Sequence, residues 1–156
     1  MVEVANEPDF GQGGTMSTTP KPVLLYDGEC GLCNALMRFM LKHDRRGVLY
    51  FAPLQGRTGQ AFLRSRGMDT EDFDSLVLID DLGRVDTTHR LRTAGALGAL
   101  GEMGGGWRRL ARVLERVPAG WRDAGYKVVA RTRYRFFGRY RPTPLPDPAW
   151  ARRILD

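Results

Sequence analysis

The feature that most constrains this chain is a pair of cysteines, Cys30 and Cys33, placed between an apolar run and an amphipathic helix. The run Val23–Tyr26 follows a proline and has the length and composition of a buried strand. The segment Asp27-Gly28-Glu29 interrupts it, and a helix is predicted at residues 30–42. Its apolar residues recur at helical spacing: Cys33, Leu36, Met37, Met40 and Leu41. Both cysteines therefore fall in the first turn of this helix.

Further strands and helices are predicted along residues 48–100. Apolar runs indicate strands at residues 48–52 and 76–79, and the turn sequence at residues 80–83 predicts a hairpin leading into a strand at residues 84–87. Helices are predicted at residues 59–66 and 93–100, and the small residues of the second would let it lie close against a sheet. The order β-α-β-α-β-β-α, with a crossover helix making the first two strands parallel, predicts an α/β fold of the thioredoxin-like type. In that fold a redox-active pair follows the first strand.

The spacing of the cysteines suits disulfide chemistry. Residues three apart on a helix are neighbours, within the Cα separation that a disulfide allows. The positive end of the helix dipole favours a thiolate at Cys30, whereas Cys33 begins the apolar stripe and is expected to point inward and stay protonated. Cys30 is therefore predicted to attack a substrate disulfide and Cys33 to resolve the mixed disulfide. Gly31 is expected to leave the face beside Cys30 unobstructed.

Two carboxylates, Asp27 and Glu29, lie close to this helix start. Their ordinary role would be to cap the helix and to stabilise its dipole. Asp27 could instead exchange a proton with Cys33. Capping is favoured for both residues, and Asp27 is retained as a candidate site residue beside Cys30 and Cys33.

Other uses of the cysteine pair are weighed against redox chemistry. The pair could be half of a zinc site, but the two histidines, His43 and His89, show no ligand spacing. Two inert buried thiols are also possible. The position of the pair favours redox chemistry, so no metal and no cofactor beyond the Cys30–Cys33 disulfide are expected.

Length and charge divide the chain into four parts. Residues 1–20 lack the basic and apolar regions of a secretory signal and are predicted to be a disordered leader, so a cytoplasmic, reducing location is expected. Residues 21–103 form the redox domain, and the glycines at 104–106 mark a boundary.

Residues 107–141 hold eleven Lys or Arg against two acidic residues, in a chain of net charge +6. They are predicted to form a basic helical extension packed on the domain, with helices ending at Pro118 and spanning residues 121–137. Residues 142–156 are a Pro-rich tail, expected to be extended, and no transmembrane segment is present.

Arginines alternate with aromatic residues near the end of the extension, from Arg131 to Arg141. This composition could bind single-stranded nucleic acid or an anionic membrane surface. It could equally be a helix that packs its aromatics on the domain while its arginines face water. The packed helix is favoured and nucleic acid is disfavoured, with an acidic or phosphorylated partner as a secondary hypothesis.

The segment from Tyr26 to Asn34 resembles the DCC family of predicted thiol-disulfide oxidoreductases, named for an Asp-x-x-Cys-x-x-Cys signature that Asp27, Cys30 and Cys33 match. The likeness covers roughly residues 23–139 and continues in residues 51–55, 74–79, Trp107, Pro118, Arg122, Asp123, Tyr126, Ala130, Arg133, Tyr134 and residues 137–139. The resemblance implies a thioredoxin-like fold and protein-disulfide reductase activity. It also implies a disulfide-containing protein or small thiol substrate and an electron-donating thiol system. The chain departs from the family in having no cysteine at residues 139–144, and from thioredoxins in having no proline at residues 73–75.

Two hypotheses of function follow, and glutathione-dependent exchange, as in glutaredoxins, is a third possibility that no sequence feature decides. The first is a thiol-disulfide oxidoreductase of the protein-disulfide reductase type. The alternative is a non-catalytic binding module that uses the basic-aromatic segment for an anionic partner.

Overall fold

The computed structural model describes residues 22–71, 76–82, 84, 86–138 and 147–155. The predicted leader, residues 1–20, lies outside these residues. So do residues 73–75, where the sequence lacks a proline, and much of the Pro-rich tail.

A mixed four-stranded sheet forms the centre of the described part of the chain. Its strands are β1 (Val23–Tyr26), β2 (Tyr50–Pro53), β3 (Val77–Ile79) and β4 (His89–Leu91), in the order β2-β1-β3-β4. β1 and β2 are parallel, whereas β3 is antiparallel to both β1 and β4. The predicted α/β class is confirmed, and this arrangement is compatible with the thioredoxin-like fold.

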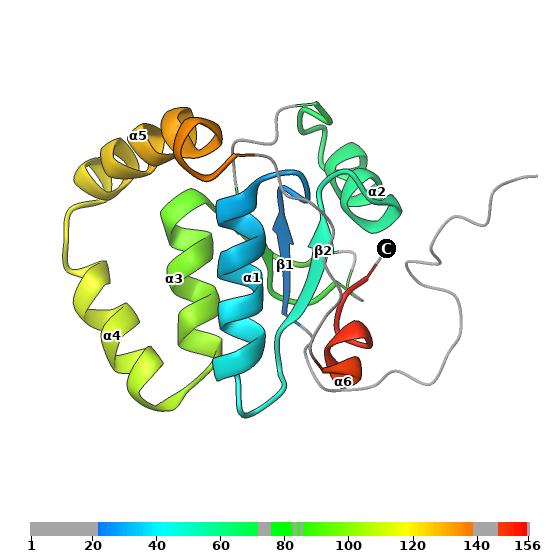
Figure 1. Cartoon of the computed structure of the whole chain (residues 1–156), viewed down its shortest axis with the longest axis horizontal. Coiled ribbons are helices and arrows are strands. Elements are labelled where there is room, and N and C mark those ends of the chain that lie inside the picture. The colour runs from blue at the N-terminus through cyan, green and yellow to red at the C-terminus, as the bar shows by residue number, and fades with distance from the viewer. Residues whose placement is uncertain (1–21, 72–75, 83, 85, 139–146, 156) are drawn as a thin grey trace, which may run out of the picture.

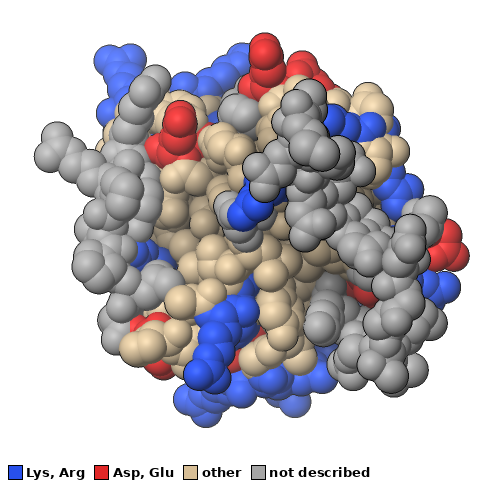
Figure 2. Space-filling model, turned by 90° about the vertical axis from the view of Figure 1, so that its right-hand side faces the viewer, with Lys and Arg blue, Asp and Glu red and all other residues tan. Residues whose placement is uncertain are grey.

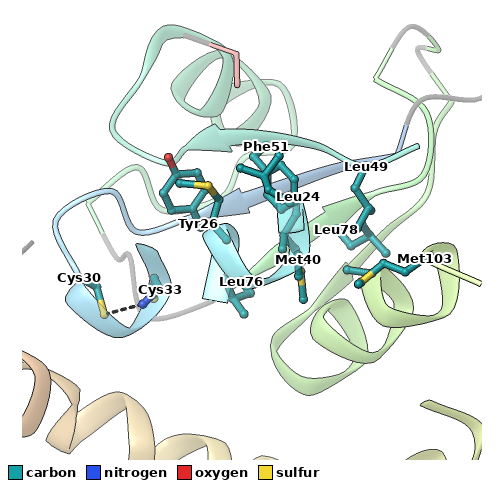
Figure 3. Packing of buried hydrophobic residues seen from close by; sticks show 13 residues of the cluster. Leu24, Tyr26, Cys30, Cys33, Met40, Leu49, Phe51, Leu76, Leu78 and Met103 are labelled. Carbon is teal, nitrogen blue, oxygen red and sulfur yellow. Dashed lines mark hydrogen bonds between the residues drawn. The ribbon is translucent and has the colours of Figure 1, made fainter. Parts of the chain in front are cut away.

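Helices cover both faces of the sheet. Alternate strand residues, such as Leu24, Phe51 and Leu78, pack with α1 (Gly31–His43) and α3 (Arg92–Glu102) on one face (Figures 1 and 3). Their neighbours along the strands pack against α2 (Arg57–Ser65) on the other face; these are Val23, Leu25, Ala52, Val77 and Ile79. Burial of both faces explains why the central strands are apolar throughout instead of alternating with polar residues.

The fourth strand lies later in the chain than predicted. The sequence places it at residues 84–87, but β4 is His89–Leu91 and pairs Ile79 with His89. The described residues before it form turns, in which Thr87 donates its backbone N–H to the carbonyl of Arg84 at 3.3 Å. The loop after β3 is thus longer than a tight hairpin, because pairing with β3 sets where the strand resumes.

The small residues of α3 bring that helix close to the sheet, as the sequence predicts. A Cβ atom on Gly95 would lie 2.8 Å from the carbonyl oxygen of Arg90, and one on Gly98 would lie 2.7 Å from the Leu78 side chain. Any larger residue at these two positions would push α3 away from β3 and β4.

Two further helices, α4 (Gly105–Glu115) and α5 (Ala119–Phe137), lie on the left-hand side of Figure 1. Gly104 has a φ of 75° and is the N-cap of α4, so the predicted glycine boundary is partly the first turn of a helix. Polar contacts tie α5 to α3 and to the residue before β3. Leu76 donates its backbone N–H to the Tyr126 hydroxyl at 3.0 Å, and the Thr93 hydroxyl donates to Asp123 at 2.8 Å.

The end of the chain returns to the open edge of the sheet. A short helix, α6 (Pro148–Ala151), precedes a parallel bridge between Ile154 and Phe51 of β2. Arg153 forms an ion pair with the buried carboxylate of Asp44 and donates to the carbonyl of Leu49 at 2.9 Å. The prediction of an extended tail is therefore wrong for residues 148–151, and this segment covers an edge that would otherwise expose unpaired backbone groups.

Charge is unevenly distributed over the surface. The face that carries α2 and α6 has both basic and acidic side chains, which surround a region of uncharged residues (Figure 2). The strongly basic helices α4 and α5 lie on the opposite side of the molecule.

Candidate active site around the cysteine pair

Cys30 and Cys33 occupy the first turn of α1, directly after the loop that leaves β1 (Figure 3). Cys30 is the N-cap residue, with an extended backbone, and its sulfur accepts a hydrogen bond from the Cys33 backbone N–H at 3.4 Å. A helix start leaves its first N–H groups without partners inside the helix, and an oxygen side chain usually accepts from them. Here a sulfur atom takes that role, so the N-terminus of α1 is aimed at Cys30.

Both cysteines are free thiols and both are buried, with exposed fractions of 0% for Cys30 and 8% for Cys33. Burial raises the pKa of Cys33 to about 12, and the hydrogen bond and charge of Cys30 add to this effect, while Arg133 opposes it. Cys33 therefore stays protonated at neutral pH, as its place on the apolar stripe predicts.

The expectation that Gly31 leaves the face beside Cys30 open is wrong. Gly31 donates its backbone N–H to the carbonyl of Gly138 at 3.3 Å. A Cβ atom at Gly31 would lie only 2.6 Å from the carbonyl oxygen of Phe137. The end of α5 thus covers this side of the helix start, and glycine is required there because no side chain would fit.

Asp27 is a buried carboxylate, with an exposed fraction of 1%. Its Oδ1 accepts hydrogen bonds from the Glu29 backbone N–H at 3.0 Å and from Gln55 Nε2 at 2.6 Å. Its Oδ2 accepts from the Tyr134 hydroxyl and pairs with Arg133 Nη2 at 3.2 Å. The prediction that Asp27 caps the helix is wrong, because Cys30 is the N-cap and Asp27 instead closes the turn before it. Glu29 is exposed.

Arg133 lies between Asp27 and Cys33. Its side chain comes from the inner face of α5, and the residue has an exposed fraction of 4%. Nη2 pairs with Asp27, and Nη1 donates to the Cys33 sulfur at 3.4 Å. Burial alone would lower the pKa of this guanidinium, but the adjacent Cys33, Cys30 and Asp27 raise it above its usual value. A permanent positive charge is therefore held against the sulfur of Cys33.

Tyr134 follows Arg133 on α5 and extends the same cluster. The Arg133 guanidinium lies 5.0 Å from the centre of the Tyr134 ring. Burial and the hydrogen bond to Asp27 raise the pKa of the Tyr134 hydroxyl, so it stays a donor to the carboxylate at neutral pH.

Two amide side chains fix the loop between β1 and α1. Gln55 Oε1 accepts from the Gly28 backbone N–H at 2.9 Å while its Nε2 donates to Asp27. Asn34 Nδ2 donates to the carbonyls of Gly28 and Cys30, each at 2.9 Å. The loop that presents Cys30 is therefore held by the turn after β2 on one side and by α1 on the other.

The sequence did not predict the roles of Arg133, Tyr134, Gln55 and Asn34. The prediction that arginines of the extension face water is wrong for Arg133, and the prediction that its aromatics pack inward is wrong for Phe136, which is 74% exposed. The signal that could have found Arg133 and Tyr134 was their presence among the residues that resemble the DCC family.

Two absences hold within the described residues. No three His, Cys, Asp or Glu side chains are grouped as metal ligands would be. None of the helices there has the length and apolar character needed to cross a bilayer.

Comparison with known proteins identifies the family to which this site belongs. The family model of the DCC1-like thiol-disulfide oxidoreductases matches residues 24–139. The uncharacterized protein YuxK of Bacillus subtilis (strain 168) is 38% identical over 141 residues, which cover 90% of this chain and 98% of that protein. A DCC family protein of Arabidopsis thaliana, named as chloroplastic, is 32% identical over 119 residues, which cover 76% of this chain and 66% of that protein. No solved structure gives a significant match.

The matched region includes both parts of the site described above, the loop of Asp27, Cys30 and Cys33 and the α5 residues Arg133 and Tyr134. The resemblance stated from the sequence is thereby confirmed, and the chain belongs to the DCC1-like thiol-disulfide oxidoreductase family.

Proposed function

We propose that this protein is a disulfide reductase that acts on a disulfide-containing protein or a small disulfide. The observation that carries the proposal is the placement of the cysteines: the Cys30 sulfur accepts the Cys33 N–H at the start of α1, with the second thiol one turn further in. Cys30 is the nucleophile, because it is the N-cap residue of α1, at the end of the helix where the dipole favours negative charge. Cys33 is the resolving thiol, and Asp27 supports the site from the preceding turn.

The reaction proceeds in two exchanges. Cys30 attacks one sulfur of the substrate disulfide, forms a mixed disulfide and releases the first substrate thiol. Cys33 then attacks Cys30, forms the Cys30–Cys33 disulfide and releases the second thiol. Two electrons and two protons pass to the substrate, and an electron-donating thiol system restores the protein dithiol. A reducing compartment, the cytoplasm, suits this direction.

Access of a substrate to the Cys30 sulfur requires a local movement of the protein. Because Cys30 is fully buried, a protein substrate reaches its sulfur only when some neighbouring segment shifts, and the end of α5, whose carbonyls lie against Gly31, is a candidate for that movement. A local opening of this kind costs less than global unfolding where few contacts hold a segment.

The test is the redox equilibrium of the cysteine pair in glutathione buffers, followed by thiol alkylation and mass shift. We expect a reversible two-electron transition near or below about −200 mV. Cys33→Ser is expected to trap a mixed disulfide with substrate, whereas Cys30→Ser forms none. A folded protein whose cysteines never form a disulfide would refute the proposal.

A second candidate, a non-catalytic binding module, is favoured by the outer side of α5. Trp121 and Phe136 expose 78% and 74% of their surface, and the exposed Lys127, Arg131 and Arg135 recur every four residues on the same helix. Such a surface suits an anionic partner. Cys30→Ser separates the two candidates, since a binding module keeps its full function without this sulfur.

A further inference from the structure

We propose that Arg133 is a catalytic residue of the second exchange, in which its guanidinium stabilises the Cys33 thiolate as that sulfur attacks the mixed disulfide. The inference rests on the proposed reductase function. It is carried by the hydrogen bond from Arg133 Nη1 to Cys33 Sγ at 3.4 Å and by the burial of the whole arginine.

The resolving step needs such a charge because of where Cys33 lies. Its sulfur sits among apolar residues of the core that face the sheet, including Met37 and Leu76, so forming a thiolate there is opposed by burial. The backbone N–H of Cys33 does not serve its own sulfur, since it donates to the Cys30 sulfur. Among the contacts described for the Cys33 sulfur, the Arg133 guanidinium is the cationic donor.

Asp27 acts in this proposal as a positioning residue. Its Oδ2 fixes Arg133 Nη2 at 3.2 Å, while Gln55 and Tyr134 hold the carboxylate in place. Because Arg133 stands between Asp27 and Cys33, the carboxylate orients the guanidinium and does not take the proton of Cys33. Asp27, the aspartate of the family signature, therefore acts through Arg133, a residue much later in the chain.

The step balances as follows. In the mixed disulfide, Cys30 Sγ is bonded to a substrate sulfur, and Cys33 gives its proton to solvent. The Cys33 thiolate attacks Cys30 Sγ, the bond from Cys30 to the substrate breaks, and the substrate leaves as a thiolate that takes up a proton. Arg133 stays protonated throughout, since a guanidinium does not titrate in this range.

The experiment mixes the reduced full-length protein rapidly with a chromogenic aromatic disulfide. The first coloured thiolate reports attack by Cys30, and the second reports resolution by Cys33. Arg133→Gln is expected to slow the second phase by about 10-fold to 100-fold. It should slow the first phase by a smaller factor, because the guanidinium is hydrogen-bonded to Cys33 and interacts with Cys30 through its charge. The second phase of this variant should also need a higher pH. Arg133→Lys should fall between wild type and Arg133→Gln, since it keeps the charge without the fork of donors.

Matched controls are Arg131→Gln and Arg135→Gln, which remove exposed charges from the same helix and should alter neither phase. If Arg133→Gln does not fold, the double variant Asp27→Asn with Arg133→Gln, which removes both buried charges, takes its place and is expected to show the same slow second phase.

The outcomes separate the two proposals. The role of Arg133 alone is overturned if the wild type releases two coloured thiolates and a folded variant without the Arg133 charge keeps the wild-type rate and pH profile in the second phase. A wild type that releases fewer than two coloured thiolates overturns the reductase function, and the role of Arg133 with it.

Discussion

Replacing Asp27 by asparagine tests how strongly the fold depends on the ion pair beside the cysteines. The new side chain keeps an oxygen for the Oδ1 donors, but it places an uncharged group where Oδ2 accepted from Tyr134 and paired with Arg133. The side chains of Arg133 and Asp27 are 5% and 0% exposed, so the guanidinium is left charged, buried and without its carboxylate. Breaking a buried pair in this way costs about 3–5 kcal/mol, and the free energy of unfolding should fall by that amount.

The assay is urea unfolding at neutral pH, followed by circular dichroism, on Asp27→Asn, Arg133→Gln and the double variant. The double variant should be more stable than the sum of the single losses predicts, by at least about 1 kcal/mol. Asp86→Asn is the matched control, because it breaks an exposed ion pair: the side chain of Asp86 is 76% exposed and that of its partner Arg84 is 66% exposed. The control should lose at most about 1 kcal/mol. If Asp27→Asn loses no more than this control, or if the two single losses simply add, the reasoning about the buried pair is refuted.

Three further predictions concern pH, packing and the chain end. The free energy of unfolding of the reduced protein should fall as the pH rises from about 9, where the thiol titrates in the unfolded chain, towards the raised pKa of Cys33 near 12, because the unfolded state then binds fewer protons. Cys33→Ser should flatten this part of the pH dependence in urea unfolding, and an unchanged slope would exclude Cys33 as the cause of the decrease. Gly31→Ala should lower the free energy of unfolding by about 1–3 kcal/mol because its Cβ meets the end of α5, whereas Gly125→Ala in open space within α5 should raise it by about 0.5–1 kcal/mol; equal thermal shifts for both would contradict the packing. Arg153→Met should lower the free energy of unfolding in urea by about 3–5 kcal/mol, because it leaves the buried carboxylate of Asp44 without its ion-pair partner, whereas the control Arg152→Met, at an exposed position, should stay within about 0.5 kcal/mol of wild type. A loss in Arg153→Met as small as in the control would show that the chain end does not stabilise the sheet edge.

The central elements could be predicted because their signals are local. The apolar run of β1 matches the structure residue for residue, and α1 ends at His43, one residue beyond the prediction. β4 could not be placed in this way. Its residues His89 and Arg90 are half-buried and polar, so the strand carries no apolar pattern, and its register is set by pairing with β3.

The candidate site could be predicted only in its N-terminal half. Cys30, Cys33 and Asp27 are close in sequence, and helix geometry alone brings the two cysteines together. Arg133 gave no local signal, because an arginine on a basic helix is expected to face water, and its partner Asp27 lies more than a hundred positions earlier. Only the folded chain shows that this one guanidinium points inward while Arg131 and Arg135 on the same helix do not.

The contact between Arg133 and Cys33 joins residues 100 positions apart, which has a consequence for the protein during its synthesis. A ribosome adds about 5–20 residues per second, so α1 and its thiols are made about 5–20 s before the arginine. During that interval the nascent chain carries a dithiol without the guanidinium that α5 later supplies. Any chain that terminates before residue 133 keeps the cysteine motif but lacks this charge, and the complete site exists only in chains whose translation has passed α5.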